Sequence, residues 1–222
     1  MVGSLYVTND PHTREKWNEL VELLKTNRYF INQNLKIFDF INDIQESTVN
    51  SGELFYRARL GSYDKAEELG APPSDKVKGG RLNPKAISYL YVARDIDTAI
   101  SEIRPWIGAT VSVAKCISHA NLKIKDFTID SGNPSAVNDF KRVINNLFAT
   151  KVDPSNNELE YMATQAIAEY IREQGYEGIQ YFSSTHDGGI NLTVFDPRKM
   201  TIEYEGQTNI ADVRYDCSPI AK

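Results

Sequence analysis

Apolar residues in the first fifty positions recur at the spacing of an amphipathic helix. Over residues 13–24 they occupy positions i, i+3, i+4 and i+7, so one helical face is apolar. Residues 35–44 carry a second apolar group of this kind, and the Ser- and Gly-containing stretch 47–52 predicts a loop. The sequence therefore predicts an N-terminal helical extension over residues 1–50, followed by the main domain over residues 51–222.

The pattern changes period after residue 53, where short runs rich in aromatic and β-branched residues replace the helical spacing. These runs predict strands at residues 54–59, 88–93, 110–115, 122–127, 178–182 and 191–195. The stretch 61–84 is rich in Gly and Pro, so we expect an irregular loop, a type of segment that often carries function. A polar region containing Pro and Asn follows residue 127.

Two helices are predicted between these strands. Asp95 or Asp97 can cap a short helix that Pro105 ends, and Glu102 lies on this helix. A longer helix is predicted over residues 161–174, because strong helix formers there are followed by a glycine. Strands and helices mixed in this order predict an α+β fold with one core.

Composition narrows the classes of function. The chain of 222 residues has a formal net charge of −5 and no run of Lys or Arg, which argues against direct binding to nucleic acid or anionic lipid. No apolar stretch approaches the roughly 20 residues that cross a bilayer, and the polar N-terminus lacks the apolar segment of a signal peptide. We therefore expect a cytoplasmic protein without a membrane partner; its oligomeric state is left open.

Cysteine and histidine give no sign of a metal site or a disulfide framework. The chain has two cysteines, Cys116 and Cys217, and three histidines, His12, His119 and His186, none at metal-ligand spacing. We therefore expect no metal, and no Cys/His or Ser/His nucleophile pair is indicated.

Four polar clusters lie at predicted strand ends or beside loops, where functional side chains are common. They are Arg57 with Arg59, the segment 79–84, Tyr89 and Tyr91 with Glu102, and Ser183 with Ser184. Each alone has an ordinary structural explanation. The arginines suit a solvated strand face, the tyrosines a half-buried strand, the glutamate an exposed helix position and the serines a turn.

The order and spacing of these clusters resemble the RES-domain family over residues 55–197. The matches are the opening strand at 55–59, Gly-Gly-Arg-Leu-Asn-Pro at 79–84, the strand 89–93 with the glutamate helix 99–102, the helix segment 164–169, and the serine segment 175–184 with 188–192. Leu82 stands where the family commonly has an aromatic residue, and Phe182 where a proline often precedes the serine. The family serine is either Ser183 or Ser184.

The resemblance implies a fold related to ADP-ribosyltransferases, with a split β-sheet core and, here, an N-terminal helical cap. It also implies that NAD is consumed as a substrate, often by the toxin of a pair with an antitoxin. Expected partners are thus NAD and a cognate antitoxin. Matching positions make Glu102, Arg81, Tyr91 and Ser183 the expected catalytic residues. Residues expected to bind NAD are Arg57, Arg81, Tyr91 and Ser183.

These residue types suit cleavage of the nicotinamide–ribose bond. The ribose carbon gains oxocarbenium character as nicotinamide leaves, and the carboxylate of Glu102 can stabilise that cation. Guanidinium groups of Arg81 and Arg57 can bind the pyrophosphate, while Tyr91 can stack on a ring and Ser183 can hydrogen-bond.

We therefore expect an NAD glycohydrolase or phosphorylase that acts as a toxin or defence effector. The alternatives are an ADP-ribosyltransferase that modifies a protein, and a catalytically silent interaction module. A dinucleotide-binding Rossmann fold is disfavoured, because neither Gly-Gly pair fits its G-x-G-x-x-G spacing.

Overall fold

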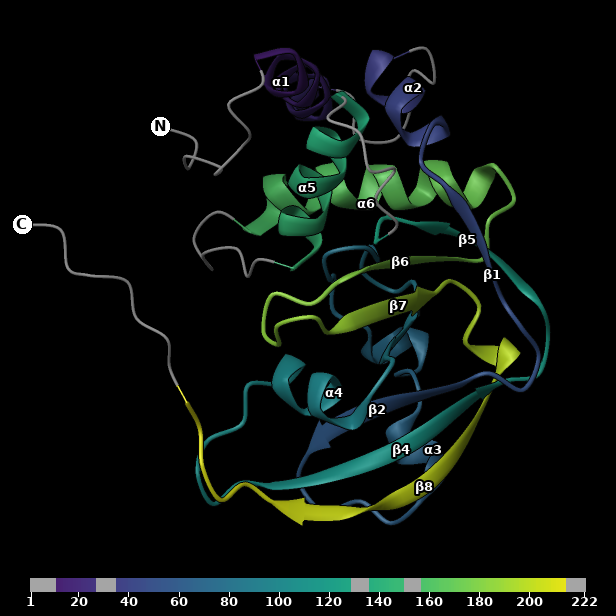
Figure 1. Ribbon diagram of the computed structural model, residues 1–222, viewed down its shortest axis with the longest axis vertical. Coiled ribbons are helices and arrows are strands. Elements are labelled where there is room, and N and C mark those ends of the chain that lie inside the picture. The colour runs from purple at the N-terminus through teal and green to yellow at the C-terminus, as the bar shows by residue number, and fades with distance from the viewer. Residues whose placement is uncertain (1–10, 27–34, 129–135, 150–156, 215–222) are drawn as a thin grey trace, which may run out of the picture.

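The computed structural model describes residues 11–26, 35–128, 136–149 and 157–214 (Figure 1). Within them, eight strands form one mixed sheet in the order β1-β5-β6-β7-β3-β2-β4-β8. The strands are β1 (Glu46–Val49), β2 (Leu54–Leu60), β3 (Leu90–Ala93), β4 (Thr110–Ser118), β5 (Leu122–Asp126), β6 (Gly178–Phe182), β7 (Ile190–Val194) and β8 (Met200–Asn209). Neighbouring strands are antiparallel except β5 and β6, which are parallel.

The sheet is split where β3 meets β2. These two strands share a single residue pair, Tyr56 with Ala93, whereas β2 pairs with β4 along its whole length from Leu54 to Leu60. Figure 1 shows the consequence: β2, β4 and β8 form one half of the sheet, and β5, β6 and β7 form the other half at a different angle. The predicted α+β class and the expected split of the sheet are confirmed.

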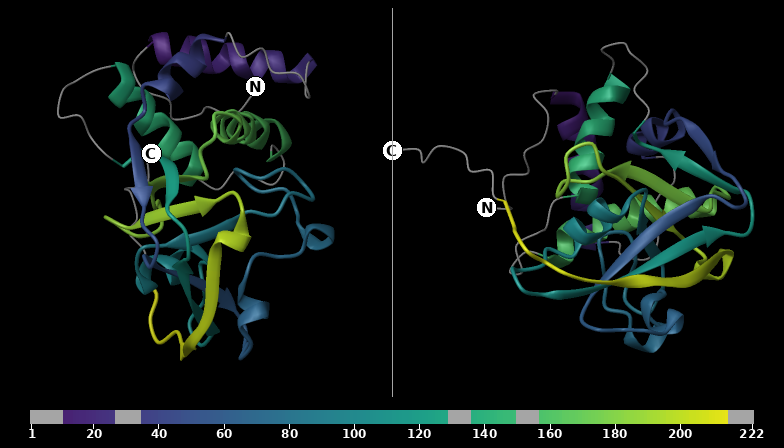
Figure 2. Two further views of the ribbon diagram at one scale, coloured as in Figure 1. Left: turned by 90° about the vertical axis from the view of Figure 1, so that its right-hand side faces the viewer. Right: turned by 60° about the horizontal axis from the view of Figure 1, so that its bottom comes forward.

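Four helices gather at one end of the molecule, beyond β5 and β6 (Figures 1 and 2). They are α1 (Pro11–Thr26), α2 (Lys36–Asn42), α5 (Ala136–Ala149) and α6 (Asn157–Glu173). They share one apolar core with the sheet, in which Trp17, Phe38, Phe140 and Ile167 are buried. Phe38 of α2 stacks on Tyr170 of α6, with ring centroids 4.0 Å apart. The N-terminal helices therefore pack directly onto the rest of the chain.

Two short helices accompany the other half of the sheet. Helix α3 (Ala66–Leu69) lies near β4 and β8, and α4 (Ile96–Glu102) lies against β2. Single 3-10 turns occur at Ser74–Lys76 and Pro197–Lys199. Across the described ranges, no helix combines the length and the apolar character needed to cross a membrane.

Most predicted elements are present, with shifted ends. The strands β2, β3, β5, β6 and β7 and the helices α1, α2, α4 and α6 lie where the periodicity indicates, although α1 begins at Pro11 and β4 continues to Ser118. Helices α3 and α5 and strand β8 were not predicted, and α3 lies inside the stretch 61–84 that was expected to be irregular.

The predicted loop over 47–52 is wrong in its first part, because β1 occupies Glu46–Val49. This strand pairs with β5, and it buries Val49 completely.

Candidate active site

A cavity of about 330 Å³ lies in the split between the two halves of the sheet. Four of the residues predicted from sequence line it: Arg57 from β2, Arg81 from the loop before β3, Tyr91 from β3, and Glu102 from α4. The structure therefore brings together side chains that span 46 positions of the chain, from 57 to 102. The fifth, Ser183, reaches the cavity wall through its contact with Glu102.

Glu102 stands at the end of a well-capped helix. The side chain of Asp95 accepts hydrogen bonds from the Thr98 amide and the Thr98 hydroxyl, each 2.7 Å long, and so caps the first turn of α4. Burial raises the pKa of Asp95, but these hydrogen bonds outweigh it and hold the pKa below its usual value. The helix ends after Glu102, where Arg104 takes a left-handed backbone conformation with φ of 48° before Pro105. Of the two predicted caps, Asp95 is the one used.

The Glu102 carboxylate is held by two neutral donors. Its Oε1 accepts from the Ser183 hydroxyl at 2.6 Å and from Nδ2 of Asn191 at 2.7 Å. Among the described residues, no Lys, Arg or His pairs with this carboxylate. The negative charge at the cavity wall is therefore positioned but not neutralised by the protein.

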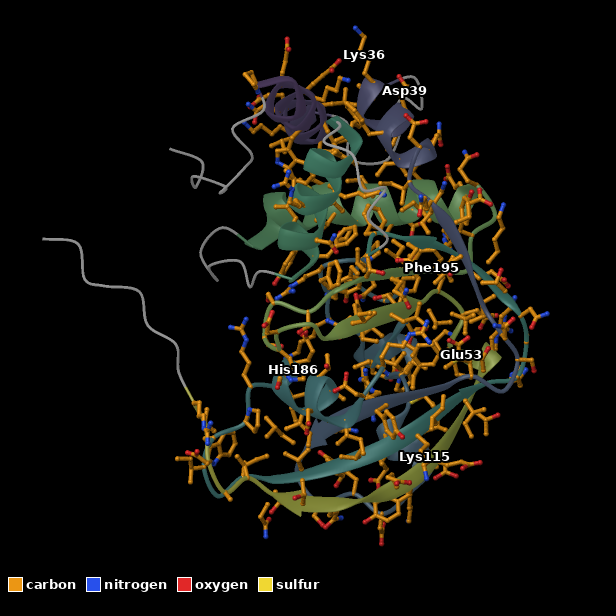
Figure 3. The ribbon with its side chains drawn as sticks, viewed as in Figure 1. Lys36, Asp39, Glu53, Lys115, His186 and Phe195 are labelled. Atoms are coloured by element: carbon orange, nitrogen blue, oxygen red, sulfur yellow. The ribbon has the colours of Figure 1, made fainter. Side chains whose placement is uncertain are left out.

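The β6–β7 loop directs the Ser183 hydroxyl toward Glu102. Backbone amides of Thr185 and His186 donate to Ser183 Oγ at 3.1 and 3.2 Å, so the hydroxyl proton is left for the carboxylate. His186 lies beside α4 in Figure 3, and its Nδ1 is 2.8 Å from the Thr98 hydroxyl. Ser184 is exposed. These contacts favour Ser183 over Ser184 as the serine of the site.

Arg57 is a half-buried cation at the split, and its Nε atom is buried. Its NH1 donates to the carbonyl of Tyr91 at 2.8 Å, which satisfies an oxygen in the region where the β2–β3 ladder is lost. Within the described ranges its Nε has no hydrogen-bond partner and no carboxylate pairs with it. Burial lowers the pKa of Arg57, yet a guanidinium stays protonated in proteins. An anion bound in the cavity would supply the missing negative charge.

The hydroxyl of Tyr91 holds the loop that carries Arg81. It donates to Oδ1 of Asn83 at 2.6 Å and accepts from the Leu82 amide at 3.3 Å. Burial raises the pKa of Tyr91, so the hydroxyl stays protonated at neutral pH. A side chain at Gly80 would place its Cβ 2.5 Å from Asn83 Oδ1, which explains a glycine there. The ring of Tyr91 is left to line the cavity.

Helices α5 and α6 fix the same loop from the other side. The Arg81 guanidinium donates to the carbonyl of Phe148, near the end of α5. From α6, the Thr164 hydroxyl donates to the carbonyl of Arg81, and Nε2 of Gln165 donates to the carbonyl of Gly80 at 2.7 Å. The helical layer thus contributes to the cavity by holding the main chain around Arg81.

Comparison with known proteins gives the chain a family. The model of the RES domain matches residues 54–216, which is well over half of the sequence. This chain belongs to the RES-domain family. No curated protein matches its sequence. Among solved structures it is similar to "Crystal structure of the M.tuberculosis MbcT-MbcA toxin-antitoxin complex", with a TM-score of 0.47 and 12% identity, over 79% of this chain and 92% of that chain. At this TM-score and identity, the similarity assigns no activity to this chain.

The two departures from the RES pattern have simple structural settings. Leu82 is fully buried in the core shared with the helical layer, so an apolar side chain suffices there. Phe182 is 41% exposed at the end of β6, directly before Ser183. The Leu82 amide donates to the Tyr91 hydroxyl, and the Phe182 amide donates to Oδ1 of Asn145. The loops that carry Arg81 and Ser183 are thus attached to β3 and α5.

Other members of the predicted clusters lie outside the cavity of this RES domain. Arg59 is exposed, donates to the Glu68 carbonyl and covers the Tyr63 ring, which fits its ordinary role on a strand face. Tyr89 is buried and donates to Glu169 at 2.6 Å, and it is not among the residues that line the cavity.

Among the polar side chains that line the cavity, sequence reasoning did not assign a role to Asn191, Tyr56 and Tyr181. Burial raises the pKa of Tyr181 to about 12. All three lie in segments that resemble the RES family, and Asn191 follows the Gly-Gly pair of the serine segment.

The histidines and cysteines of the described residues form no metal site. Among the described residues, no three His, Cys, Asp or Glu side chains come together as a metal site would require. Cys116 is buried in β4. Cys217 and the side chain of His12 lie outside the described part of the structure.

Proposed function

We propose that this RES domain consumes NAD by cleaving its nicotinamide–ribose bond. The observation that carries the proposal is the Glu102 carboxylate, which lies at the cavity wall with two neutral donors and no described cation partner. When nicotinamide leaves with the bonding electron pair, the ribose carbon becomes cationic. A fixed, unneutralised carboxylate stabilises that charge more in the transition state than in the ground state.

The positive charge along the same cavity suits the remainder of NAD. Arg57 is a half-buried cation without a described carboxylate partner, and Arg81 lines the same cavity. Guanidinium groups bind phosphate oxygens through paired donors, so these two residues would hold the pyrophosphate. At about 330 Å³ the cavity lies at the small end of ligand pockets, which favours the nicotinamide–ribose end of NAD as its occupant.

The acceptor of the ADP-ribosyl group decides the class of enzyme. Water yields ADP-ribose and a proton, phosphate yields ADP-ribose phosphate, and a protein side chain yields an ADP-ribosylated protein. The small size of the cavity favours water or phosphate. The role as a toxin or defence effector, and control by a cognate antitoxin, belong to the proposal through the family resemblance alone.

The proposal is tested by product analysis with matched variants. Purified protein is incubated with NAD alone, with phosphate and with cell extract, and nicotinamide and ADP-ribosyl products are separated by chromatography. Arg57→Gln should raise the Michaelis constant for NAD about tenfold or more, because it removes a charged donor to phosphate. Arg59→Gln, two residues along the same strand but exposed, should change it little. Folded wild type that releases no nicotinamide in any of the three conditions would contradict the proposal.

A further inference from the structure

The second donor to Glu102, Asn191, comes from a strand that is paired on both sides. Asn191 lies on β7, which pairs with β6 on one side and with β3 on the other. Its register partners are Tyr181 and Ala93, and the residue is 5% exposed. Ser183, the other donor, lies in the loop after β6. Of the two donors, Asn191 is the one anchored by hydrogen-bonded ladders on both sides.

Both donors reach the same oxygen of the carboxylate. Ser183 Oγ and Asn191 Nδ2 lie 2.6 and 2.7 Å from Oε1, and a carboxylate oxygen has two lone pairs in its plane. Oε1 is therefore fully used by the protein. No hydrogen bond from the described residues reaches Oε2, so this oxygen is left for the reacting ribose.

Glu102 needs hydrogen bonds from outside α4, because its place at the end of that helix does not fix its side chain. Helix α4 has seven residues, and Glu102 is its last. A glutamate at the end of a short helix can choose among several rotamers, and fixing one of them costs conformational entropy. A donor on a central strand selects the rotamer before the substrate binds, which is the condition for electrostatic stabilisation of a developing charge.

We propose that Asn191 is a positioning residue that fixes the Glu102 carboxylate and leaves Oε2 facing the substrate. The inference rests on the proposed function and adds a role that acts through Glu102. Asn191 also lines the cavity, so a direct contact with substrate is the competing role that the experiment must separate.

The test uses three variants of the full chain. Asn191→Leu keeps the approximate shape and removes the donor, and Asn191→Asp keeps the shape and places a second carboxylate against Glu102. Thr193→Val is the control, since Thr193 is buried two residues along the same strand and is not among the residues lining the cavity. Kinetic constants for nicotinamide release are measured against pH, with thermal unfolding as the check on folding.

A positioning role predicts a loss in kcat without a matching change in KM. Asn191→Leu should lower kcat by about 10- to 100-fold and change KM less than about threefold, because the lost interaction matters most in the transition state. Asn191→Asp should also lower kcat, because it replaces the donor with a second carboxylate that repels the charge of Glu102. Thr193→Val should stay within about twofold of wild type.

A second measurement does not depend on turnover. Crystal structures of the free wild type and of Asn191→Leu show directly where the Glu102 carboxylate lies. Loss of the Asn191 donor should let the Glu102 side chain leave the single rotamer that it holds in wild type. A Glu102 side chain that stays in place in Asn191→Leu, an unchanged kcat, or a raised KM with unchanged kcat would each overturn the positioning role of Asn191. A Glu102 side chain that moves in Asn191→Leu, together with a folded wild type that releases no nicotinamide, would instead overturn the proposed function.

Discussion

Substitution of one glycine should damage the cavity from outside the catalytic residues. In Gly80→Ala, the new Cβ would lie 2.5 Å from Asn83 Oδ1 and 3.3 Å from the Tyr91 hydroxyl oxygen. Asn83 is buried, and Oδ1 accepts the hydrogen bond from that hydroxyl, so neither group can move aside without breaking the contact. Neighbouring Gly79 offers the control: its added Cβ would meet the nearest atoms at 3.6 and 3.9 Å, which is ordinary contact.

The size of the effect follows from these contacts. Relief of the overlap at Asn83 should cost about 1–3 kcal/mol, as added groups do in packed interiors. Loss of the Tyr91–Asn83 hydrogen bond adds about 0.5–1.5 kcal/mol, so Gly80→Ala should lower the free energy of unfolding by about 1.5–4.5 kcal/mol. Gly79→Ala should be neutral or slightly stabilising, by up to about 1 kcal/mol, because alanine restricts the unfolded chain.

Denaturant unfolding and nicotinamide release measure the two consequences. Gly80→Ala should also lower kcat/KM by about tenfold or more, because Arg81 is the next residue and its loop must shift. The interpretation of this loop would be refuted if Gly80→Ala matched Gly79→Ala in both unfolding free energy and activity.

Three further predictions concern the helix, the thiol and the serine loop. Asp95→Ala should lower the free energy of unfolding by about 0.5–2 kcal/mol, because the cap on the Thr98 amide is lost, and thermal unfolding measures this change. Because the pKa of Asp95 is lowered in the folded protein, the stabilisation by Asp95 should be present at neutral pH and be lost as the pH falls through that pKa. Cys116, whose pKa burial raises to about 12, should resist alkylation at pH 8 in the folded protein and react after unfolding, as followed by mass spectrometry; rapid native labelling would contradict its burial. Ser183→Ala should lower kcat more than Ser184→Ala, and the reverse order in the nicotinamide assay would show that Ser184 is the functional serine.

Local signals in the sequence account for much of the fold near the cavity. The cap at Asp95 and the stop at Pro105 bracket α4, so the place of Glu102 at the end of a helix could be predicted. The resemblance to RES domains supplied Arg57, Arg81, Tyr91 and Ser183. In the structure, Arg57, Arg81 and Tyr91 line the same cavity as Glu102. Ser183 donates a hydrogen bond to Glu102. Their catalytic roles stay predictions.

The edge strands could not be predicted because their stability comes from distant partners. Strand β8 is largely exposed, so it lacks the alternation of a half-buried strand, and it exists through its pairing with β4. Strand β1 has one buried residue, Val49, and depends on β5. Helix α5 differs, since Phe140, Ile144 and Phe148 are buried at helical spacing that the polar composition of the region obscured.

Asn191 shows the limit of sequence reasoning at the cavity. Its position after a Gly-Gly pair was visible, but its contact with Glu102 requires that α4 and β7 meet across 89 residues of chain. Likewise, the lack of a described carboxylate partner for Arg57 is a property of the folded split and not of any motif.

The most direct test of the central claim is the fate of NAD on wild type and on Glu102→Gln, with binding and nicotinamide release measured on the same preparations. Asp97→Asn serves as the control, because Asp97 is an exposed carboxylate on the same helix. Wild type and Asp97→Asn should release nicotinamide at similar rates, whereas Glu102→Gln should bind NAD with similar affinity and release nicotinamide at least ~100-fold more slowly. Equal release by Glu102→Gln and wild type would contradict the role of this carboxylate and the function built on it.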